Sequence, residues 1–380
     1  MNFQPTMKLR LLIIASGLAA GCLSCSHGVS QSDNSVDTIS LKGEILIPYE
    51  HLWEPTRLFA SDHRIFVLNS MSADTLFNEF TTSGLKVRNF LTKGSGPNEV
   101  TRMSSIYYNS ANNSLCFTAP NKKLIQLNLS ASQLTLSPIF ELNPENGKDI
   151  NAMAGHENWM FDNGLTVSSI ASDKGYFGVF DKDGMFKRFA VDPIPADDFG
   201  GNASAGVKYN FLHPWGGMSA DGRHAAWVMG QADMLVIANQ SADSIIFSTN
   251  YVAPPKGIKF LSDEGEHFSF EYTDEQTTYF FGEPTVSDSH IYVQYIGMLN
   301  SDMRSYANDI INHQSEPKCE VRIYNFDGTL QRVLNLNCMY GSIAVSPDDK
   351  TLYIISEGPE DGINLRKFDL PDMTNHKPSN

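Results

Sequence analysis

Residues 93–100 read KGSGPNEV, a glycine-rich stretch between two short apolar segments. Such a stretch forms either a phosphate-binding loop or a joint between two pieces of β-sheet. A phosphate loop needs Lys and Ser or Thr after its last glycine, and a helix whose N-terminus faces the anion. Here Asn98, Glu99 and Val100 follow, and the next apolar segment, MSSIYYN, has the character of a strand. The stretch is therefore predicted to join two pieces of sheet.

Short apolar runs that follow polar turns recur along the whole chain. Five of them are RIFVLN (64–69), SLCFTA (114–119), HAAWVM (224–229), HIYVQY (290–295) and TLYIIS (351–356). They are rich in β-branched and aromatic residues and bounded by turn residues, which is typical of strands. Their alternation of polar and apolar residues is weak, which indicates that both faces are buried.

A second hairpin follows most of these runs after roughly 20 residues, as in a four-stranded repeat. Gly84, Gly184 and Gly328 lie in the turns of three such hairpins, where a left-handed backbone is common. The first turn of each repeat is marked by Asp62, Asn112, Asn163, Asp221, Asp288 and Asp349. The repeat length of about 50–60 residues, with two hairpins in each repeat, indicates propeller blades.

The six anchors predict an all-β fold, a six-bladed β-propeller of four-stranded antiparallel blades in a single domain over residues 36–371. A β-sandwich is the alternative, but it does not account for the recurring order of two hairpins. The last blade lacks a fourth strand after INLRKFDL (363–370), whereas VDTISLKGEILIP (36–48) has no partner of its own. The N-terminal strand is therefore predicted to complete the sixth blade, which would remove exposed sheet edges.

KGSGPNEV then connects the outermost strand of the first blade to the innermost strand of the second. We expect Gly94 and Gly96 to adopt dihedral angles that other residues avoid, and Pro97 to stiffen the exit.

The N-terminus has the features of an export signal rather than of a folded segment. Lys8 and Arg10 precede the apolar run LLIIASGLAAG, which is too short to span a bilayer. Residues 1–21 are predicted to be a lipoprotein signal peptide, Cys22 the lipidated residue and 22–35 a polar tether. The alternatives are a plain secretory signal with an incidental cysteine, and lipidation at Cys25. Residues 372–380 form a polar tail.

The G-x-G-P-x-E stretch between blades, the AAGC sequence before the tether and the six blades resemble the TolB-like six-bladed propeller lipoproteins of bacteria. The resemblance covers most of residues 36–371, and only the Gly-Pro-Glu stretch is motif-like. It implies the propeller fold and a location in the cell envelope, and it implies no catalytic residues. We expect a lipid-anchored protein, at the outer membrane and facing the periplasm.

The charge of the chain excludes one class of partner. With 43 acidic and 28 basic residues the net charge is −15, whereas nucleic-acid binding needs a basic surface. The expected partners are the membrane, through the lipid anchor, and a protein or glycan of the envelope.

Loops before the innermost strands carry unusual residues, and ligands of propellers commonly bind at such loops. The candidate ligand-binding residues are His51, Trp53, Glu54, His156, His213, Trp215, Glu283 and Tyr340. They would line the mouth of the axial channel, where aromatic faces and carboxylates suit sugar rings or peptides. Alternatively, the tryptophans fill the wedges between blades.

A binding or interaction module is therefore the predicted function, and a metal-dependent propeller hydrolase or lyase of glycans or lactones is the alternative. His51, His156 and His213 could converge on the axis, but no H-x-H, HExxH or C-x-x-C sequence sets a metal site. We predict no metal, no cofactor and no catalytic residue. G-x-S-x-G is also absent from the sequence.

Two features concern the fifth blade. Residues 297–318 interrupt it between its second and third strands with a helix-like sequence, either a partner-binding insertion or a harmless excursion. Cys319 and Cys338 flank the Gly328 hairpin almost symmetrically and are predicted to form a disulfide.

Overall fold

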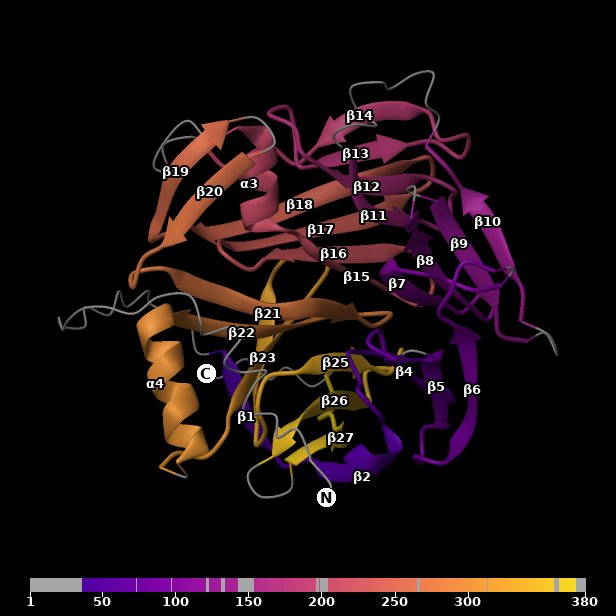
Figure 1. The fold of residues 1–380 in the computed structure, drawn as a ribbon, viewed down its shortest axis with the longest axis vertical. Helices are drawn as coiled ribbons and strands as arrows, with labels where there is room; N and C mark the ends of the chain where they lie inside the picture. Colours follow the sequence, from indigo (N-terminus) through magenta and orange to yellow (C-terminus); the bar gives the residue numbers. More distant parts are fainter. Residues whose placement is uncertain are drawn as a thin grey trace.

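The computed structural model describes residues 36–373, except residues 73, 97, 121–122, 131–133, 143–153, 196–197, 199–203, 265–266, 313 and 359–361. The predicted signal peptide and the tether with Cys22 and Cys25 lie outside the described residues. The strands form six four-stranded antiparallel blades in a ring, which confirms the predicted propeller (Figure 1).

The first three blades follow the chain from the innermost strand outward. Blade 1 consists of β3 (Arg57–Ala60), β4 (Arg64–Leu68), β5 (Thr75–Thr81) and β6 (Lys86–Thr92). Blade 2 consists of β7 (Ser104–Asn109), β8 (Ser114–Ala119), β9 (Lys123–Asn128) and β10 (Leu136–Phe140). Blade 3 consists of β11 (Ala154–Met160), β12 (Thr166–Ile170), β13 (Phe177–Phe180) and β14 (Phe186–Ala190).

The last three blades have the same order. Blade 4 consists of β15 (Trp215–Met218), β16 (His224–Met229), β17 (Asp233–Ser241) and β18 (Ser244–Ala253). Blade 5 consists of β21 (Thr277–Val286), β22 (Ile291–Leu299), β23 (Cys319–Tyr324) and β24 (Leu330–Leu336). Blade 6 consists of β25 (Ser342–Val345), β26 (Thr351–Gly358), β27 (Gly362–Asp369) and β2 (Glu44–Pro48).

The N-terminal segment closes the ring, as predicted, but it does so on two blades. β2 pairs antiparallel with β27 and buries Ile47 between blades 6 and 1. β1 (Asp37–Leu41), which the sequence pattern does not separate from β2, pairs parallel with β24 as a fifth strand of blade 5. Its Ile39 and Leu41 pack against the core of blades 5 and 6. One short segment therefore ties both of these blades to the rest of the ring.

The KGSGPNEV joint lies where the sequence predicted it, but its glycines have another role. Neither Gly94 nor Gly96 has a positive φ. Instead, the Glu99 side chain folds back over the loop and its Oε2 accepts a hydrogen bond from Gly96 N–H at 2.8 Å. A Cβ atom on Gly94 would overlap Glu99 Oε2. The glycines are required because this carboxylate approaches the backbone closely.

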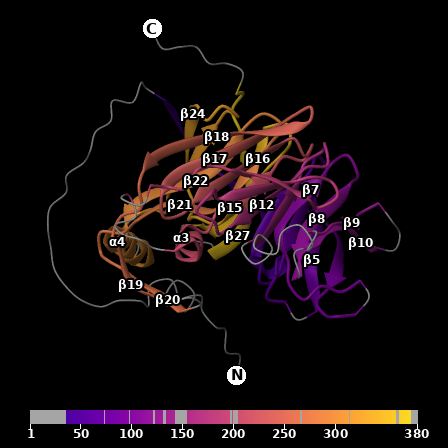
Figure 2. The ribbon, with the colours of Figure 1, turned by 90° about the horizontal axis from the view of Figure 1, so that it is seen from above.

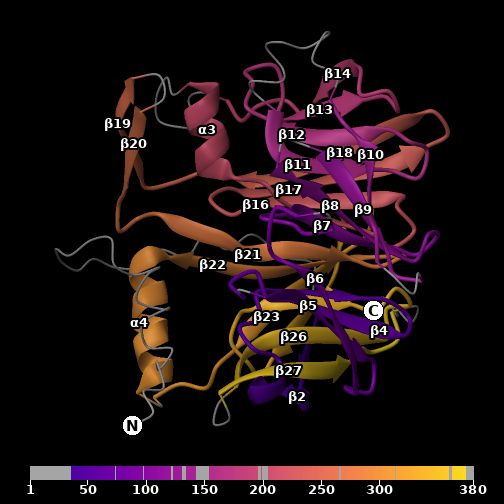
Figure 3. The ribbon, with the colours of Figure 1, turned by 45° about the vertical axis from the view of Figure 1, so that its right-hand side comes forward.

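Three insertions project from one face of the ring, which we call the insertion face (Figures 2 and 3). They are α3 (Ala205–Leu212), the hairpin β19 (Ile258–Glu264)–β20 (His267–Tyr272), and α4 (Asn300–Ile311). Of these, only α4 was expected from the sequence. A short 3-10 helix, η1 (Tyr49–His51), precedes β3. No helix within the described ranges is long and apolar enough to cross a membrane.

The predicted disulfide between Cys319 and Cys338 is not formed, because both side chains are buried free thiols. Cys319 lies opposite Leu336 in the hairpin of β23 and β24, so Cys338 falls two residues past the facing position. The two cysteines belong instead to the apolar core between blades 5 and 6.

Candidate functional site

A cavity of about 200 Å³ lies on the axis of the ring. Its described walls come from β3, β7, β15, β21 and β25 and the residues next to them, so five of the six innermost strands contribute. No residue of blade 3 that the structure describes belongs to this wall. Blades 2 and 4 contact each other directly, because Ser110 N–H donates a hydrogen bond of 2.8 Å to the Ala220 carbonyl. Pockets for drug-sized ligands are commonly about 300–1,000 Å³. This cavity therefore suits a small molecule or a single side chain.

An ion pair between two blades stands in the wall of this cavity. Arg57, at the start of β3, contacts Glu283 of β21 through its guanidinium group. Both side chains are partly buried, with 28% and 24% of their surface exposed. Burial raises the pKa of Glu283, and the positive charge of Arg57 opposes that rise. The pair is thus a polar and charged feature in a wall that also holds aromatic side chains.

Glu157 of β11 is a second carboxyl group near this pair. Its side chain is buried, and its Oε2 has no hydrogen-bond partner among the described residues. Burial raises the pKa of Glu157 to about 8; the negative charge of Glu283 adds to the rise, and Arg57 opposes it. A buried carboxyl with an unsatisfied oxygen is costly, and proteins usually keep such groups for a reason beyond packing.

Aromatic residues surround these charges. Trp215, Phe281, Tyr107 and Tyr108 belong to the wall of the cavity. Burial raises the pKa of Tyr209 of α3 to about 12; the hydrogen bond with Ser169 opposes that rise, and the charge of Glu157 adds to it. The Tyr209 hydroxyl is 2.8 Å from Ser169 Oγ. The α3 insertion therefore contributes to the surroundings of Glu157.

Two of the predicted ligand-binding residues, Trp215 and Glu283, line the cavity. Tyr340 lies directly before the lining residue Gly341, is half-buried, and donates a hydrogen bond of 3.0 Å to the Tyr295 carbonyl. Its ring lies against Phe281 at a centroid distance of 5.7 Å. The structure thus brings these three residues to one axial region.

Three other predicted residues, His51, Trp53 and Glu54, are exposed on the segment before β3 and do not belong to the cavity wall. Trp53 is 69% exposed and has a φ of 55°, an unusual combination for a bulky residue. They form a surface feature separate from the cavity.

The remaining predicted residues are His213 and His156. His213 ends α3 in a left-handed conformation, is exposed, and lies edge-on to Trp215 at 6.4 Å between ring centroids. His156 lies on β11, but its side chain is outside the described part of the structure.

The alternative that tryptophans at the blade entries fill wedges between blades holds for Trp159, and Trp227 is buried in the same way. Trp159 and Trp227 are fully buried, 6.3 Å apart and edge-to-face, and Trp159 also stacks on Tyr107 at 5.6 Å. These rings join blades 2, 3 and 4. The Trp53 side chain is exposed, and the Trp215 side chain is partly buried.

Sequence reasoning missed Arg57 and Glu157. Arg57 follows the EPT sequence two residues after Pro55, and Glu157 is the neighbour of the chosen His156. The available signal was their position: both lie on innermost strands, as Glu283 does. Only the ion pair that Arg57 forms with Glu283 of another blade distinguishes these positions from other residues on strands.

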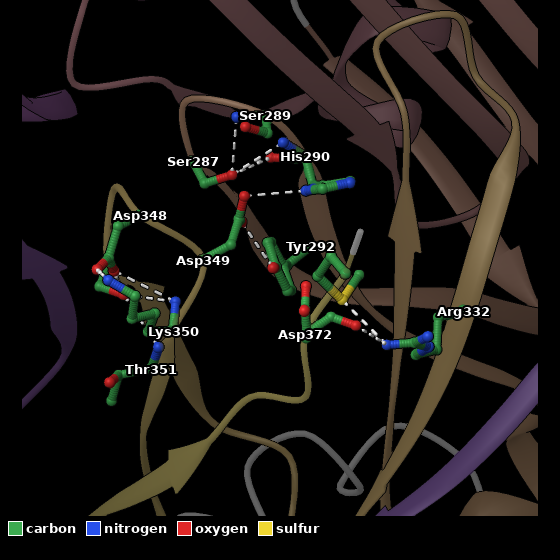
Figure 4. Close-up of polar contacts among 12 residues, drawn as sticks. Ser287, Ser289, His290, Tyr292, Arg332, Asp348, Asp349, Lys350, Thr351 and Asp372 are labelled. Carbon is green, nitrogen blue, oxygen red and sulfur yellow. Dashed lines mark hydrogen bonds and ion pairs between the residues drawn. The ribbon is translucent and has the colours of Figure 1, made fainter. Parts of the chain in front are cut away.

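Within the described ranges, no group of three His, Cys, Asp or Glu residues is arranged to hold a metal ion. At the turns of blades 5 and 6, His290 Nδ1 lies 2.9 Å from Asp349 Oδ2, and the Tyr292 hydroxyl donates to Asp349 Oδ1 at 2.7 Å (Figure 4). Ser287 Oγ instead accepts a hydrogen bond from the His290 backbone N–H at 2.8 Å. This network joins two blades.

A family model matches part of the chain. The family DUF5128, described as a 6-bladed beta-propeller, matches residues 51–189, which span blades 1 to 3. The curated proteins include no match.

Three solved structures are similar to this chain over most of its length. A protein of Bacteroides fragilis NCTC 9343 described as a candidate exported protein is 12% identical, with a TM-score of 0.49, and the alignment covers 88% of this chain and 100% of that one. A calcium-binding protein, regucalcin, of Agrobacterium tumefaciens is 13% identical, with a TM-score of 0.43 and coverage of 89% and 98%. A luciferin-regenerating enzyme is 9% identical, with a TM-score of 0.42 and coverage of 86% and 95%.

Proposed function

We propose that this protein is an exported, lipid-anchored binding module that holds a small polar ligand in its axial cavity. The observation that carries the proposal is the Arg57–Glu283 ion pair in the wall of a cavity of about 200 Å³, with buried Glu157 close by. Charged groups are seldom kept in partly buried positions without a role, and a cavity with few polar groups is the usual form of a ligand site.

A larger partner would use a different surface. Exposed His51, Trp53 and Glu54 before β3 offer an aromatic face, an imidazole and a carboxylate to a glycan or protein of the envelope. The insertion face, with α4, offers a second area for such a partner. The cavity itself is too small for an oligosaccharide.

Cavity binding is tested with a thermal-shift screen of small metabolites against the mature protein and its Trp215→Ala variant. A ligand of the cavity should raise the melting temperature of the wild type and lose affinity in the variant, because Trp215 lines the cavity. Trp53→Ala is the matched control, since Trp53 lies outside the lining. Equal affinity in the wild type and Trp215→Ala would contradict binding at this cavity.

The envelope location rests on the basic residues, the apolar run and Cys22, and on the resemblance to TolB-like propeller lipoproteins. Cys22→Ser should release the protein from the membrane fraction or leave it unprocessed, whereas Cys25→Ser should change little. Membrane fractionation of Cys22→Ser that matches the wild type would overturn the lipid anchor.

A further inference from the structure

The two charges in the wall of the axial cavity cancel. Arg57 and Glu283 are the only charged residues among the described residues of that wall, and they pair with each other. A charged ligand would leave the wall with a net charge or would have to separate the pair, and both are costly where the side chains are partly buried. The wall therefore favours a ligand without net charge.

The ion pair still has hydrogen-bonding positions to offer. Arg57 Nη2 contacts Glu283 Oε1, and within the described residues neither side chain makes another hydrogen bond or ion pair. A guanidinium has more N–H groups, and a carboxylate more lone pairs, than this one contact uses. A hydroxyl group can both donate and accept a hydrogen bond. Two adjacent hydroxyls can therefore donate to Glu283 and accept from Arg57 while the pair stays intact.

The polar and the apolar parts of the wall lie at different ends of the cavity. The innermost strands of a propeller run in the same direction along its axis. Arg57, Trp215 and Ser342 begin β3, β15 and β25, whereas Met218 and Val345 end β15 and β25. The Ser342 hydroxyl has no hydrogen-bond partner among the described residues. One end of the cavity thus combines free donors and acceptors with an indole ring, and the other end is apolar.

The size of the cavity and the ring of Trp215 narrow the ligand class further. A volume of about 200 Å³ is smaller than that of a pocket for a drug-sized ligand, so there is room for one ring with a few substituents. The Trp215 side chain is partly buried and belongs to the wall. A monosaccharide has a rim of adjacent hydroxyls and an apolar C–H face that packs against aromatic rings. Both parts match this end of the cavity.

We infer that the axial cavity binds one neutral monosaccharide, whose adjacent hydroxyls bridge Arg57 and Glu283 and whose C–H face lies on Trp215. This inference rests on the proposed function, because it names the ligand class of the same cavity. The Ser342 hydroxyl, at the same end of the cavity, supplies a further hydrogen bond to the sugar.

The test compares neutral sugars with charged sugars of nearly the same shape. Glucose, galactose and mannose, with the uronate and the amino sugar of each, are titrated into the mature protein at about pH 6, where the amino sugars are charged. Isothermal titration calorimetry measures the affinities. We expect at least one neutral sugar to bind at least about tenfold more tightly than its two charged counterparts, because a charge would lose hydration without gaining a partner.

Variants at the ring and at the ion pair locate the sugar. Trp215→Ala should abolish most of the binding, and Tyr49→Ala, an exposed aromatic residue outside the wall, should keep it. Glu283→Gln leaves Arg57 unpaired, so the uronate should gain affinity relative to the neutral sugar. Arg57→Gln leaves Glu283 unpaired, so the amino sugar should gain instead. Glu50→Gln removes an exposed carboxylate before β3 and should leave the order of affinities unchanged.

Several outcomes would overturn the inference alone. One is a metabolite that binds the wild type and loses affinity in Trp215→Ala, while no neutral sugar binds. Another is a uronate or an amino sugar that binds the wild type as tightly as the neutral sugar does. A third is an unchanged selectivity in both charge variants; if neither variant folds, the selectivity of the wild type decides.

The remaining outcomes concern the place of binding. A neutral sugar that binds the wild type and Trp215→Ala equally, or that loses affinity in Trp53→Ala, occupies another surface, and the inference is overturned. If neither the sugars nor the metabolite screen reveal a ligand of the cavity, both the inference and the proposed function fail.

Discussion

The Glu99 carboxylate occupies the space that a side chain on Gly94 would need. It is held there by the 2.8 Å hydrogen bond from Gly96 N–H to Glu99 Oε2. The G-x-G-P-x-E stretch is thus a self-contained joint, in which the acid binds the backbone of its own loop and the glycines make room for it.

Gly94→Ala should lower the free energy of unfolding by about 1–2 kcal/mol, because Glu99 must swing away and lose its hydrogen bond. Urea unfolding measures this loss. Gly206→Ala is the control: Gly206 lies in α3 with no other atom within 4 Å of an added Cβ, so the change should be neutral or mildly stabilising. In a Glu99→Ala background, Gly94→Ala should cost much less; an undiminished cost would disprove the steric account.

If β2 closes the ring, replacing its two isoleucines should have very different effects on the stability of the protein. Ile47 is 1% exposed between blades 6 and 1, so Ile47→Ala should destabilise the protein by about 2–4 kcal/mol. Ile45 is 42% exposed, and Ile45→Ala should cost under about 1 kcal/mol. Thermal and urea unfolding of both variants give the comparison. Equal costs would show that β2 does not close the ring in solution.

Removal of residues 36–48 should be more severe than either point change. The truncated protein would expose the edges of both β27 and β24, and aggregation on heating is expected. Light scattering during a thermal ramp measures it, and a deletion of residues 26–33 is the control. A truncated protein that stays monomeric and melts like the mature form would contradict the double closure.

The loss of stability on replacing a tryptophan should depend on how deeply its ring is buried, and not on its position in the blade. Trp227→Ala should cost about 3–5 kcal/mol, since the ring is fully buried against Trp159 and Phe177. Trp53→Ala should stay within about 0.5 kcal/mol of the wild type because the ring is 69% exposed. Equilibrium unfolding followed by far-UV circular dichroism distinguishes them; a large loss for Trp53→Ala would assign that ring a packing role.

Glu157 should make stability fall as pH rises. Its pKa is about 8 in the folded protein and near the ordinary value of 4.5 when unfolded, so between these pH values the folded state binds more protons. Stability from this group is therefore full below pH 4.5 and is lost progressively up to about pH 8. Glu157→Gln should flatten the fall of unfolding free energy between about pH 5 and 8, by an amount of order a few kcal/mol. An unchanged slope in that variant would contradict the raised pKa.

The fold was readable from the sequence because its signals are local and repeated. Turn residues such as Asp62 and Asp221, the hairpin glycines Gly84 and Gly328, and the short apolar runs each act through a few neighbouring residues. Six repetitions of the same order then fix the architecture, and the unpaired segment at residues 36–48 predicts the closure. β19–β20 and α3 lie outside this repeat, so the periodicity gave no signal for them.

The candidate site is formed by contacts between residues that are far apart in the chain, and local sequence patterns do not reveal such contacts. Arg57 and Glu283 are far apart in the chain and meet only because blades 1 and 5 face a common axis. Glu157 looks like any strand glutamate until burial next to that pair raises its pKa. For Cys319 and Cys338 the sequence pattern was misleading. Their symmetric spacing around Gly328 suggested a disulfide, but the register of β23 and β24 places Cys319 opposite Leu336.

The sequence by itself determined the number of blades, their strand order and the closing strand, because backbone hydrogen bonding and turn geometry depend on neighbouring residues. Only the tertiary structure decided which charges meet at the axis, which tryptophans are buried, and why Gly94 must be glycine. Those outcomes depend on how six sheets pack around one line, and side chains from different blades come together only after the ring has closed.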